Sequence, residues 1–207
     1  MNLSYKTIRS RCEASFTEKK SEFIGYLCPV TTEQEAIDFI NEIRSLHRKA
    51  THNCYAYILR DNNIARHSDD GEPGGTAGVP IYDVLNKTGV TDIACVVTRY
   101  FGGIMLGTGG LVRAYSKGAS MALDAADILT MEIADSLKIT VDYSFYGNVT
   151  AIAAEYHAII KNTDYADNVN VFIDVKSEYT EELKNKLIDK CNGRVDIEFI
   201  DKGYKEI

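Results

Sequence analysis

The sequence predicts an α+β protein of two domains, residues 1–134 and residues 135–207. Apolar residues recur at two-residue spacing in some segments and at helical spacing in others, which indicates that strands and helices alternate. The chain of 207 residues is longer than the roughly 100–150 residues of a typical domain. The formal net charge is −2 up to residue 134 and −5 after it, and eight of the nine arginines lie in the first part. These arginines place the expected chemistry in the first domain.

The first domain is expected to open with two strands, over 5–16 and 22–30. Thr32 and Glu35 have the spacing of a capping box, in which each residue hydrogen-bonds the other's backbone amide. This pair therefore predicts the start of a helix, and its apolar spacing continues to His47.

A hairpin is predicted next. An aromatic-rich strand over 53–60 leads into Asp61-Asn62-Asn63, a typical turn sequence, and a short strand then ends near Ser68. After a loop, helical spacing of apolar residues begins at Pro80, and Gly89 marks the expected end of that helix.

The strand from Ile93 to Tyr100 is predicted to be central in its sheet, because its first half is apolar on both faces. A glycine-rich loop follows it. The helix after the loop should bury Leu111, Tyr115 and Ala119 on one apolar face.

From residue 137 onward, the predicted order is strand, helix, two strands, helix and strand. The first of these helices is expected to extend to Ile160. A βαββαβ order over about 70 residues predicts a ferredoxin-like domain. Because that fold serves many functions, it says little about the role of the second domain.

Composition and charge exclude several classes of protein. Apolar runs such as 93–97 are far shorter than the roughly 18 residues of a membrane-spanning helix, and residues 1–16 lack the apolar stretch of a signal peptide. We therefore expect a cytoplasmic protein with no membrane partner. Five cysteines without a Cys-x-x-Cys pair fit reduced thiols. A pI near 5.2 excludes nucleic-acid coating by bulk charge, and we expect no DNA sequence specificity.

Five glycines in nine residues make the loop after the central strand the first candidate site. Glycine permits positive φ and close approach of a ligand to the backbone, and the following helix directs unpaired N–H groups toward an anion. The alternative is a purely structural tight turn. For the binding hypothesis, the candidate residues are Arg99, Tyr100, Gly102, Gly103, Gly107, Gly109, Gly110 and Arg113.

An acidic loop is the second candidate site, because it places Asp69, Asp70 and Glu72 within four positions. Such a cluster can hold a hard cation or shift a carboxyl pKa, and it can equally cap backbone amides and pair with arginine. His52 is expected to support this loop, and Cys54 should share its strand face. Because the spacing matches no standard zinc site, no metal ligand is assigned.

Long segments of the first domain resemble a known family. Residues 50–57, 68–78, 97–103 and 106–115, which include both candidate loops, closely resemble the bacterial YigZ branch of the IMPACT family. Met105 departs from this pattern, because many bacterial members are expected to have lysine there. This departure removes one positive charge from the glycine loop.

The resemblance implies a fold and a cellular process. It implies that the first domain has the fold of a small-subunit ribosomal protein's second domain, of elongation-factor domain IV and of the GHMP kinases. The second domain is then similar to the last domain of elongation factor G. Eukaryotic relatives regulate translation under starvation, so the resemblance points to translation.

Two functional hypotheses follow. In the first, a non-enzymatic regulatory protein linked to translation or stress binds RNA, the ribosome or a translation-associated protein through the arginines and glycines of the loop, without a cofactor. In the second, an enzyme acts on a phosphate-bearing small molecule, and the acidic loop holds Mg²⁺ or acts as a base. The two differ in what Asp69, Asp70 and Glu72 do.

Overall fold

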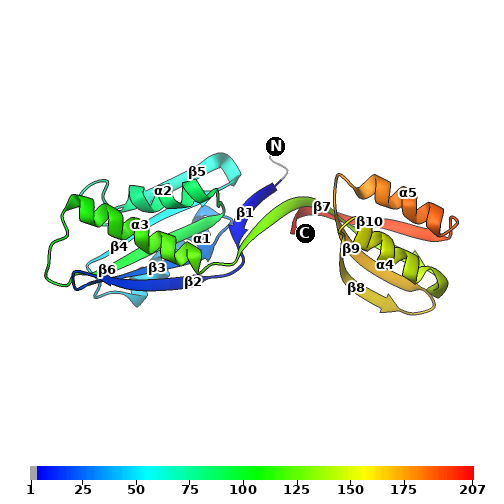
Figure 1. Cartoon of the computed structure of the whole chain (residues 1–207), viewed down its shortest axis with the longest axis horizontal. Helices are drawn as coiled ribbons and strands as arrows, with labels where there is room; N and C mark the ends of the chain where they lie inside the picture. The colour runs from blue at the N-terminus through cyan, green and yellow to red at the C-terminus, as the bar shows by residue number, and fades with distance from the viewer. Residues whose placement is uncertain (1–3) are drawn as a thin grey trace. The chain divides into compact units, whose positions relative to one another are not determined.

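The structure, a computed structural model, describes residues 4–207 and comprises two compact units, 5–129 and 130–207 (Figure 1). The boundary proposed from the sequence, between residues 134 and 135, falls inside a single long strand, β7 (Ile128–Val141). Each unit has its own sheet and its own apolar core. Both units mix helices and strands, which confirms the α+β class.

The first unit is built on an antiparallel sheet with strand order β2-β3-β6-β4-β5. Strand β6 is central, as the sequence predicted, and it is buried along almost its whole length. The expected single strand over 5–16 is two strands, β1 and β2. Strand β1 (Ser4–Ile8) lies outside this sheet, whose strands are β2 (Cys12–Glu18), β3 (Ser21–Pro29), β4 (His52–Leu59), β5 (Ile64–Ser68) and β6 (Ile93–Tyr100), with a short 3-10 turn at Asp61–Asn63.

Helices cover both faces of this sheet. Helix α1 (Glu33–Leu46) packs on one face, and α2 (Gly78–Thr88) and α3 (Thr108–Asp124) pack on the other, so two separate apolar clusters form around the sheet. The predicted capping box of Thr32 starts α1, and Gly89 ends α2 in the left-handed conformation. Both boundaries follow from local capping interactions, which can be predicted from the residues at these positions.

The second unit has the predicted βαββαβ order. Its core strands pair in the order β10-β7-β9-β8, and all pairs are antiparallel. The central strands are β7 and β9, which are the first and third of these four strands along the chain. This is the ferredoxin-like arrangement. The remaining elements are α4 (Tyr146–Glu155), β8 (Ile159–Tyr165), β9 (Val169–Lys176), α5 (Thr180–Lys190) and β10 (Val195–Glu206), with a 3-10 turn at Tyr143–Phe145.

Two boundaries in this unit differ from the sequence prediction. Ile159 and Ile160 were expected at the end of the first helix, but they open β8. His157 adopts a positive φ of 52°, which breaks the helix without the glycine or proline that usually signals such a stop. Over residues 4–207, none of the helices is long and apolar enough to cross a membrane.

Candidate functional site

Both candidate loops lie at one end of the first sheet. The strand register pairs Arg99 with His52 and Tyr55 with Ser68, so the exit of β6, the start of β4 and the exit of β5 meet at this edge. The β2–β3 turn joins them, because Glu22 pairs with Tyr100. Segments far apart in sequence therefore converge here.

A buried ion pair links the two loops. The Arg99 guanidinium donates to Glu72 Oε1 at 2.7 Å, and the Tyr115 hydroxyl donates to the same oxygen at 2.7 Å. The Arg99 side chain is 6% exposed and that of Glu72 is 4% exposed. Arg99 also lies over the rings of Phe23 and Phe101, at 5.5 and 5.3 Å from their centroids. The charge of Arg99 is thus balanced inside the protein.

His52 faces the second oxygen of Glu72. Its Nδ1 lies 2.8 Å from the Asp70 carbonyl oxygen, which can only accept, so Nδ1 carries the proton. In the neutral ring, Nε2 is then an acceptor, and it lies 3.8 Å from Glu72 Oε2. His52 therefore lies against both the Asp70 backbone and the Glu72 carboxylate.

Asp69 organises the acidic loop by accepting hydrogen bonds from backbone amides. Its Oδ1 accepts from Ala77 and Gly78 at 2.9 and 2.8 Å, and its Oδ2 accepts from Gly75 at 2.8 Å. Burial raises the pKa of Asp69, but these three amides outweigh burial and hold the pKa below its usual value. The carboxylate of Asp69 thereby shapes the loop and the start of α2.

Asp70 ties the acidic loop to its surroundings. Its Oδ1 accepts from Arg44 at 2.8 Å, and its Oδ2 accepts from the Asn53 amide at 2.7 Å. The Cys54 thiol donates to the Asp69 carbonyl oxygen at 2.9 Å, and burial raises the pKa of this thiol. Each acid of the loop thus has protein donors as partners, and residues 4–207 contain no cluster of three or more His, Cys, Asp or Glu side chains arranged to hold a metal.

Two positions of the glycine loop require glycine for geometric reasons. A Cβ on Gly102 would lie 1.9 Å from the Lys20 carbonyl oxygen, so only glycine lets the loop pack against the β2–β3 turn. Gly107 has φ of 74° and is the N-cap of α3, with no side chain capping the helix. The first N–H groups of α3 therefore point outward without an intrahelical partner.

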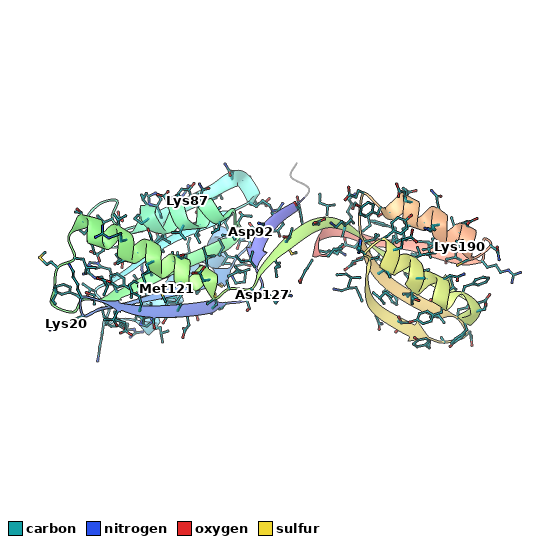
Figure 2. All side chains as sticks on the ribbon, viewed as in Figure 1. Lys20, Lys87, Asp92, Met121, Asp127 and Lys190 are labelled. Atoms are coloured by element: carbon teal, nitrogen blue, oxygen red, sulfur yellow. The ribbon has the colours of Figure 1, made fainter. Side chains whose placement is uncertain are left out.

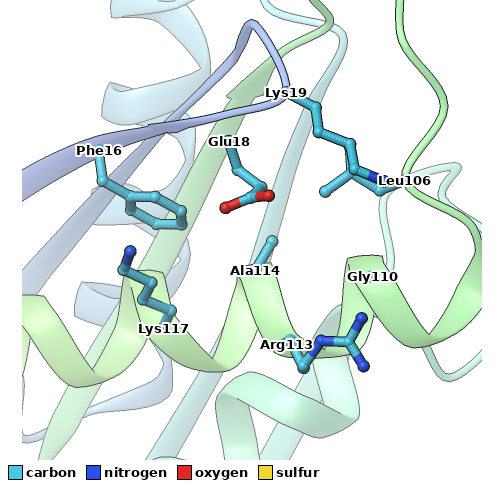
Figure 3. A pocket seen from close by; sticks show the side chains of 8 residues that line it. All are labelled: Phe16, Glu18, Lys19, Leu106, Gly110, Arg113, Ala114 and Lys117. Atoms are coloured by element: carbon cyan, nitrogen blue, oxygen red, sulfur yellow. The ribbon is translucent and has the colours of Figure 1, made fainter.

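A cationic pocket of about 250 Å³ lies beside the start of α3 (Figure 3). We call it the Lys117 pocket; it is lined by Phe16, Glu18, Lys19, Leu106, Gly110, Arg113, Ala114 and Lys117. Lys19 reaches it from the β2–β3 turn, whereas Arg113 and Lys117 come from α3. Lys117 Nζ lies 4.4 Å from the centroid of the Phe16 ring. Within the described part of the chain, these three cations have no ion-pair partner.

A second pocket, of about 400 Å³, lies between the two candidate loops. We call it the Glu72 pocket. Half-buried His52 and the buried polar groups of Glu72 and Arg99 line it together with exposed apolar side chains such as Phe101 and Met105. Both pockets include Leu106, so the glycine loop forms a wall of each.

The structure separates the candidate residues into three groups. Arg99 was a candidate binding residue of the glycine loop, but its guanidinium is buried because it pairs with Glu72. Tyr100 was another candidate binding residue, but its hydroxyl lies 2.8 Å from His47 Nδ1, because neighbouring residues on a strand point to opposite faces. Arg113 is exposed near the start of α3. Gly103, Gly109 and Gly110 also lie in the loop or the first turn of α3.

Sequence reasoning missed several members of this site. Tyr115 was assigned to the apolar face of its helix, and the hydrogen bond from its hydroxyl to Glu72 was not predicted. A hydroxyl on an otherwise apolar face was the available signal, because a buried hydroxyl needs a partner. Lys19, Lys117 and Phe101 reach the site only through the chain's tertiary arrangement.

The fold and this site define a two-domain α+β protein with a glycine-rich loop on its first domain and a ferredoxin-like second domain. Comparison with known families gives the more specific assignment. Residues 19–123 match the Impact N-terminal domain, and residues 139–194 match a domain of unknown function, DUF1949. The chain belongs to the IMPACT family, which confirms the resemblance seen in its loops.

Curated relatives match over most of the chain. The IMPACT family member YvyE of Bacillus subtilis is 39% identical over 98% of this chain and 94% of its own length. The IMPACT family member YigZ of Escherichia coli is 34% identical over 86% of this chain and 89% of its own length. The protein IMPACT homolog of Dictyostelium discoideum is 41% identical over 45% of this chain and 28% of its own length.

A solved structure matches almost the whole length of this chain. The crystal structure of a hypothetical protein superimposes with a TM-score of 0.63 and 31% sequence identity, over 97% of this chain and 99% of that chain. Both units therefore belong to a fold already seen in a crystal structure.

Proposed function

We propose that this protein is a regulatory RNA-binding protein linked to translation, and that it binds RNA phosphates at the Lys117 pocket without a metal. One observation carries the proposal: Lys19, Arg113 and Lys117 surround an open pocket beside the uncapped start of α3. The proposal places the protein in the cytoplasm, where its partner is RNA, either free or in the ribosome.

The local charges support phosphate binding despite the acidic composition. Unpaired cations and outward N–H groups at a helix start both attract anions, and the helix dipole adds to their effect. Glu18 is the one acid in this pocket, against three cations. Binding through such a local patch is compatible with a net charge of −7.

Strain in the β2–β3 turn also supports a functional role. Lys19 and Lys20 have φ of 45° and 66°, which are values of a type I′ turn that normally takes Asn and Gly. Left-handed conformations cost about 1–2 kcal/mol for an ordinary residue, and such strain concentrates at functional sites. Two lysines held in these positions project positive charge next to the glycine loop.

The alternative hypothesis of metal-assisted catalysis is less well supported by the contacts. It requires carboxylate oxygens of the acidic loop to be directed at a bound cation. Asp69 instead accepts hydrogen bonds from three backbone amides, and Asp70 accepts hydrogen bonds from Arg44 and from one backbone amide. Glu72 neutralises Arg99. The loop is therefore a scaffold that fixes the site.

Binding of a labelled single-stranded RNA at 50 and 200 mM salt tests the proposal. We expect Arg113→Ala and Lys117→Ala to weaken binding and to lower the slope of log affinity against log salt by about one each, because each removes a phosphate contact. Lys87→Ala is the matched control, since Lys87 is exposed on α2 of the same unit and has the same charge (Figure 2).

The result that overturns the proposal is equally direct. If the purified wild-type protein binds neither RNA nor ribosomes at 50 mM salt, RNA is not its partner. Equal losses for Lys87→Ala and Arg113→Ala would show that binding depends on overall charge and not on this pocket.

A further inference from the structure

The Glu72 pocket has the features of a site for a flat, partly polar group. Its volume of about 400 Å³ lies within the roughly 300–1,000 Å³ of small-molecule pockets. Its buried polar groups come from the strand ends and the acidic loop, and its apolar groups come from the glycine loop. A ligand can therefore make hydrogen bonds inside and apolar contacts at the rim.

The hydrogen-bonding groups directed at this space include two acceptors. Glu72 Oε1 is occupied by Arg99 and Tyr115, whereas Glu72 Oε2 accepts no hydrogen bond from residues 4–207. The His52 tautomer that carries its proton on Nδ1, beside the Asp70 carbonyl oxygen, presents Nε2 as an acceptor 3.8 Å from Oε2. A ligand that satisfies both atoms must carry two neighbouring donors.

An aromatic surface lies beside these acceptors. The Arg99 guanidinium covers the Phe101 ring at 5.3 Å from its centroid, and Phe101 remains 48% exposed. A flat ring can stack on the exposed part of Phe101. Met105 is 85% exposed at the same rim, and its flexible thioether can close over a stacked ring.

We propose that the Glu72 pocket binds a guanine base of single-stranded RNA, in addition to the phosphate contacts at the Lys117 pocket. This inference rests on the proposed function. Guanine presents two adjacent donors, N1–H and the N2 amino group, to Glu72 Oε2 and His52 Nε2. Adenine and cytosine each have one amino donor next to a ring-nitrogen acceptor, and uracil has a single N–H between two carbonyls. Each of these bases would therefore place one of its own acceptors against Glu72 Oε2 or His52 Nε2.

In this proposal the two pockets bind different parts of one RNA strand. Phosphates bind at the Lys117 pocket on one side of the glycine loop, and a base unstacks into the Glu72 pocket on the other. Leu106 lines both pockets and lies between the two sites. Stacking on Phe101 holds a base inside the pocket, and the two acceptors can select guanine only from bases that are held there.

Fluorescence anisotropy with four labelled ten-nucleotide RNAs tests this inference: oligouridine, and the same strand with a central guanosine, adenosine or cytidine. We expect the guanosine strand to bind the wild-type protein roughly tenfold more tightly than the other three. Phe101→Ala should abolish this advantage by removing the stacking surface. Phe199→Ala, which changes a residue of the second unit that is 53% exposed, is the matched control and should leave it intact.

Glu72→Gln tests the acceptor, with its melting temperature recorded because the ion pair to Arg99 is lost. It should remove the guanosine preference while retaining oligouridine binding; Phe101→Ala keeps the test valid if this variant does not fold. Equal affinity of the wild-type protein for all four strands overturns the inference and leaves the proposed function standing. A failure to bind any strand overturns both.

Discussion

Arg99 and Glu72 form an ion pair in which both partners are almost completely buried, with the guanidinium between the rings of Phe23 and Phe101. The pair connects the exit of the central strand to the acidic loop. Its atoms are well satisfied on the Glu72 side, because Tyr115 adds a second hydrogen bond. The pair therefore fixes the position of one loop relative to the other.

Removing one partner should unfold or strongly destabilise the first unit. We expect Arg99→Ala to lower the free energy of unfolding by about 3–5 kcal/mol, because it leaves the Glu72 charge buried and unpaired. Urea denaturation followed by circular dichroism measures this loss. The double variant Arg99→Met with Glu72→Leu should recover part of it, since neither charge then remains. A loss below about 1 kcal/mol for Arg99→Ala would contradict a structural role for the pair.

Local signals made much of the fold predictable. Capping chemistry at Thr32 and Gly89 fixed the two helix boundaries that the sequence placed best, and the apolar run of Ile93–Tyr100 identified the central strand. The long β7 strand was predicted less well. Its first half lies only partly buried, so its apolar residues show no clear two-residue alternation.

The candidate site was predictable as two loops but not as a network. A cluster of glycines and a cluster of acids are visible in the sequence, whereas the pairing of Arg99 with Glu72 depends on strand order. The same limit explains why Lys19 was missed. Its role arises from the packing of the β2–β3 turn against Gly102, which no local pattern encodes.

That contact between Gly102 and the turn leads to a second prediction. We expect Gly102→Ala to lower stability by about 1–3 kcal/mol, because the added Cβ would overlap the backbone of Lys20 and force the turn or the loop to move. Gly74→Ala is the matched control, since nothing lies within 4 Å of its Cβ and its φ is ordinary. Thermal unfolding of both variants measures the difference. Equal melting temperatures would show that the contact is easily relieved.

The Asp69 carboxylate gives a prediction about acid stability. Its pKa in the folded protein lies below its usual value, so the ionised form stabilises the fold at pH values above that usual value. This stabilisation should be lost as the pH falls through the lowered pKa. Asp69→Asn should lower the free energy of unfolding by about 1–3 kcal/mol at neutral pH, because one of the two carboxylate oxygens that accept hydrogen bonds from backbone amides is lost.

Urea denaturation at pH 7 and pH 3 measures both parts of this prediction. The difference between wild type and Asp69→Asn should shrink at the lower pH. Asp83→Asn serves as the control, because Asp83 is exposed on the same helix that Asp69 precedes. A difference that does not change with pH would assign the effect to packing instead of charge.

His47 should make the first unit less stable in mild acid. Burial lowers the pKa of His47, and both of its ring nitrogens are engaged, with the hydroxyls of Tyr26 and Tyr100 at 2.7 and 2.8 Å. The folded protein thus favours the neutral ring, so stability should fall as the pH decreases below the usual histidine value of about 6.5. Histidine NMR signals followed by pH titration should show His47 titrating below the usual histidine value of about 6.5. A His47 pKa at or above that usual value would contradict the prediction.

The β2–β3 turn offers a test in which stability and function should change in opposite directions. Lys19 and Lys20 occupy positive-φ positions that favour Asn and Gly, so Lys19→Asn with Lys20→Gly relieves backbone strain. We expect the double variant to raise the free energy of unfolding by about 1 kcal/mol. It should also weaken RNA binding, because it removes two positive charges next to the glycine loop. The Asn-Gly turn should therefore make the protein more stable but weaken its binding of RNA.

Charge and strain can be separated with a second pair of variants. Lys19→Gln with Lys20→Gln removes both charges but keeps ordinary side chains at positive φ, so it should weaken RNA binding without raising stability. Thermal unfolding and anisotropy with the same labelled RNA measure both properties for each variant. If the Asn-Gly turn is more stable and binds RNA as tightly as the wild type, the lysines serve no binding role and the Lys117 pocket depends on Arg113 and Lys117 alone.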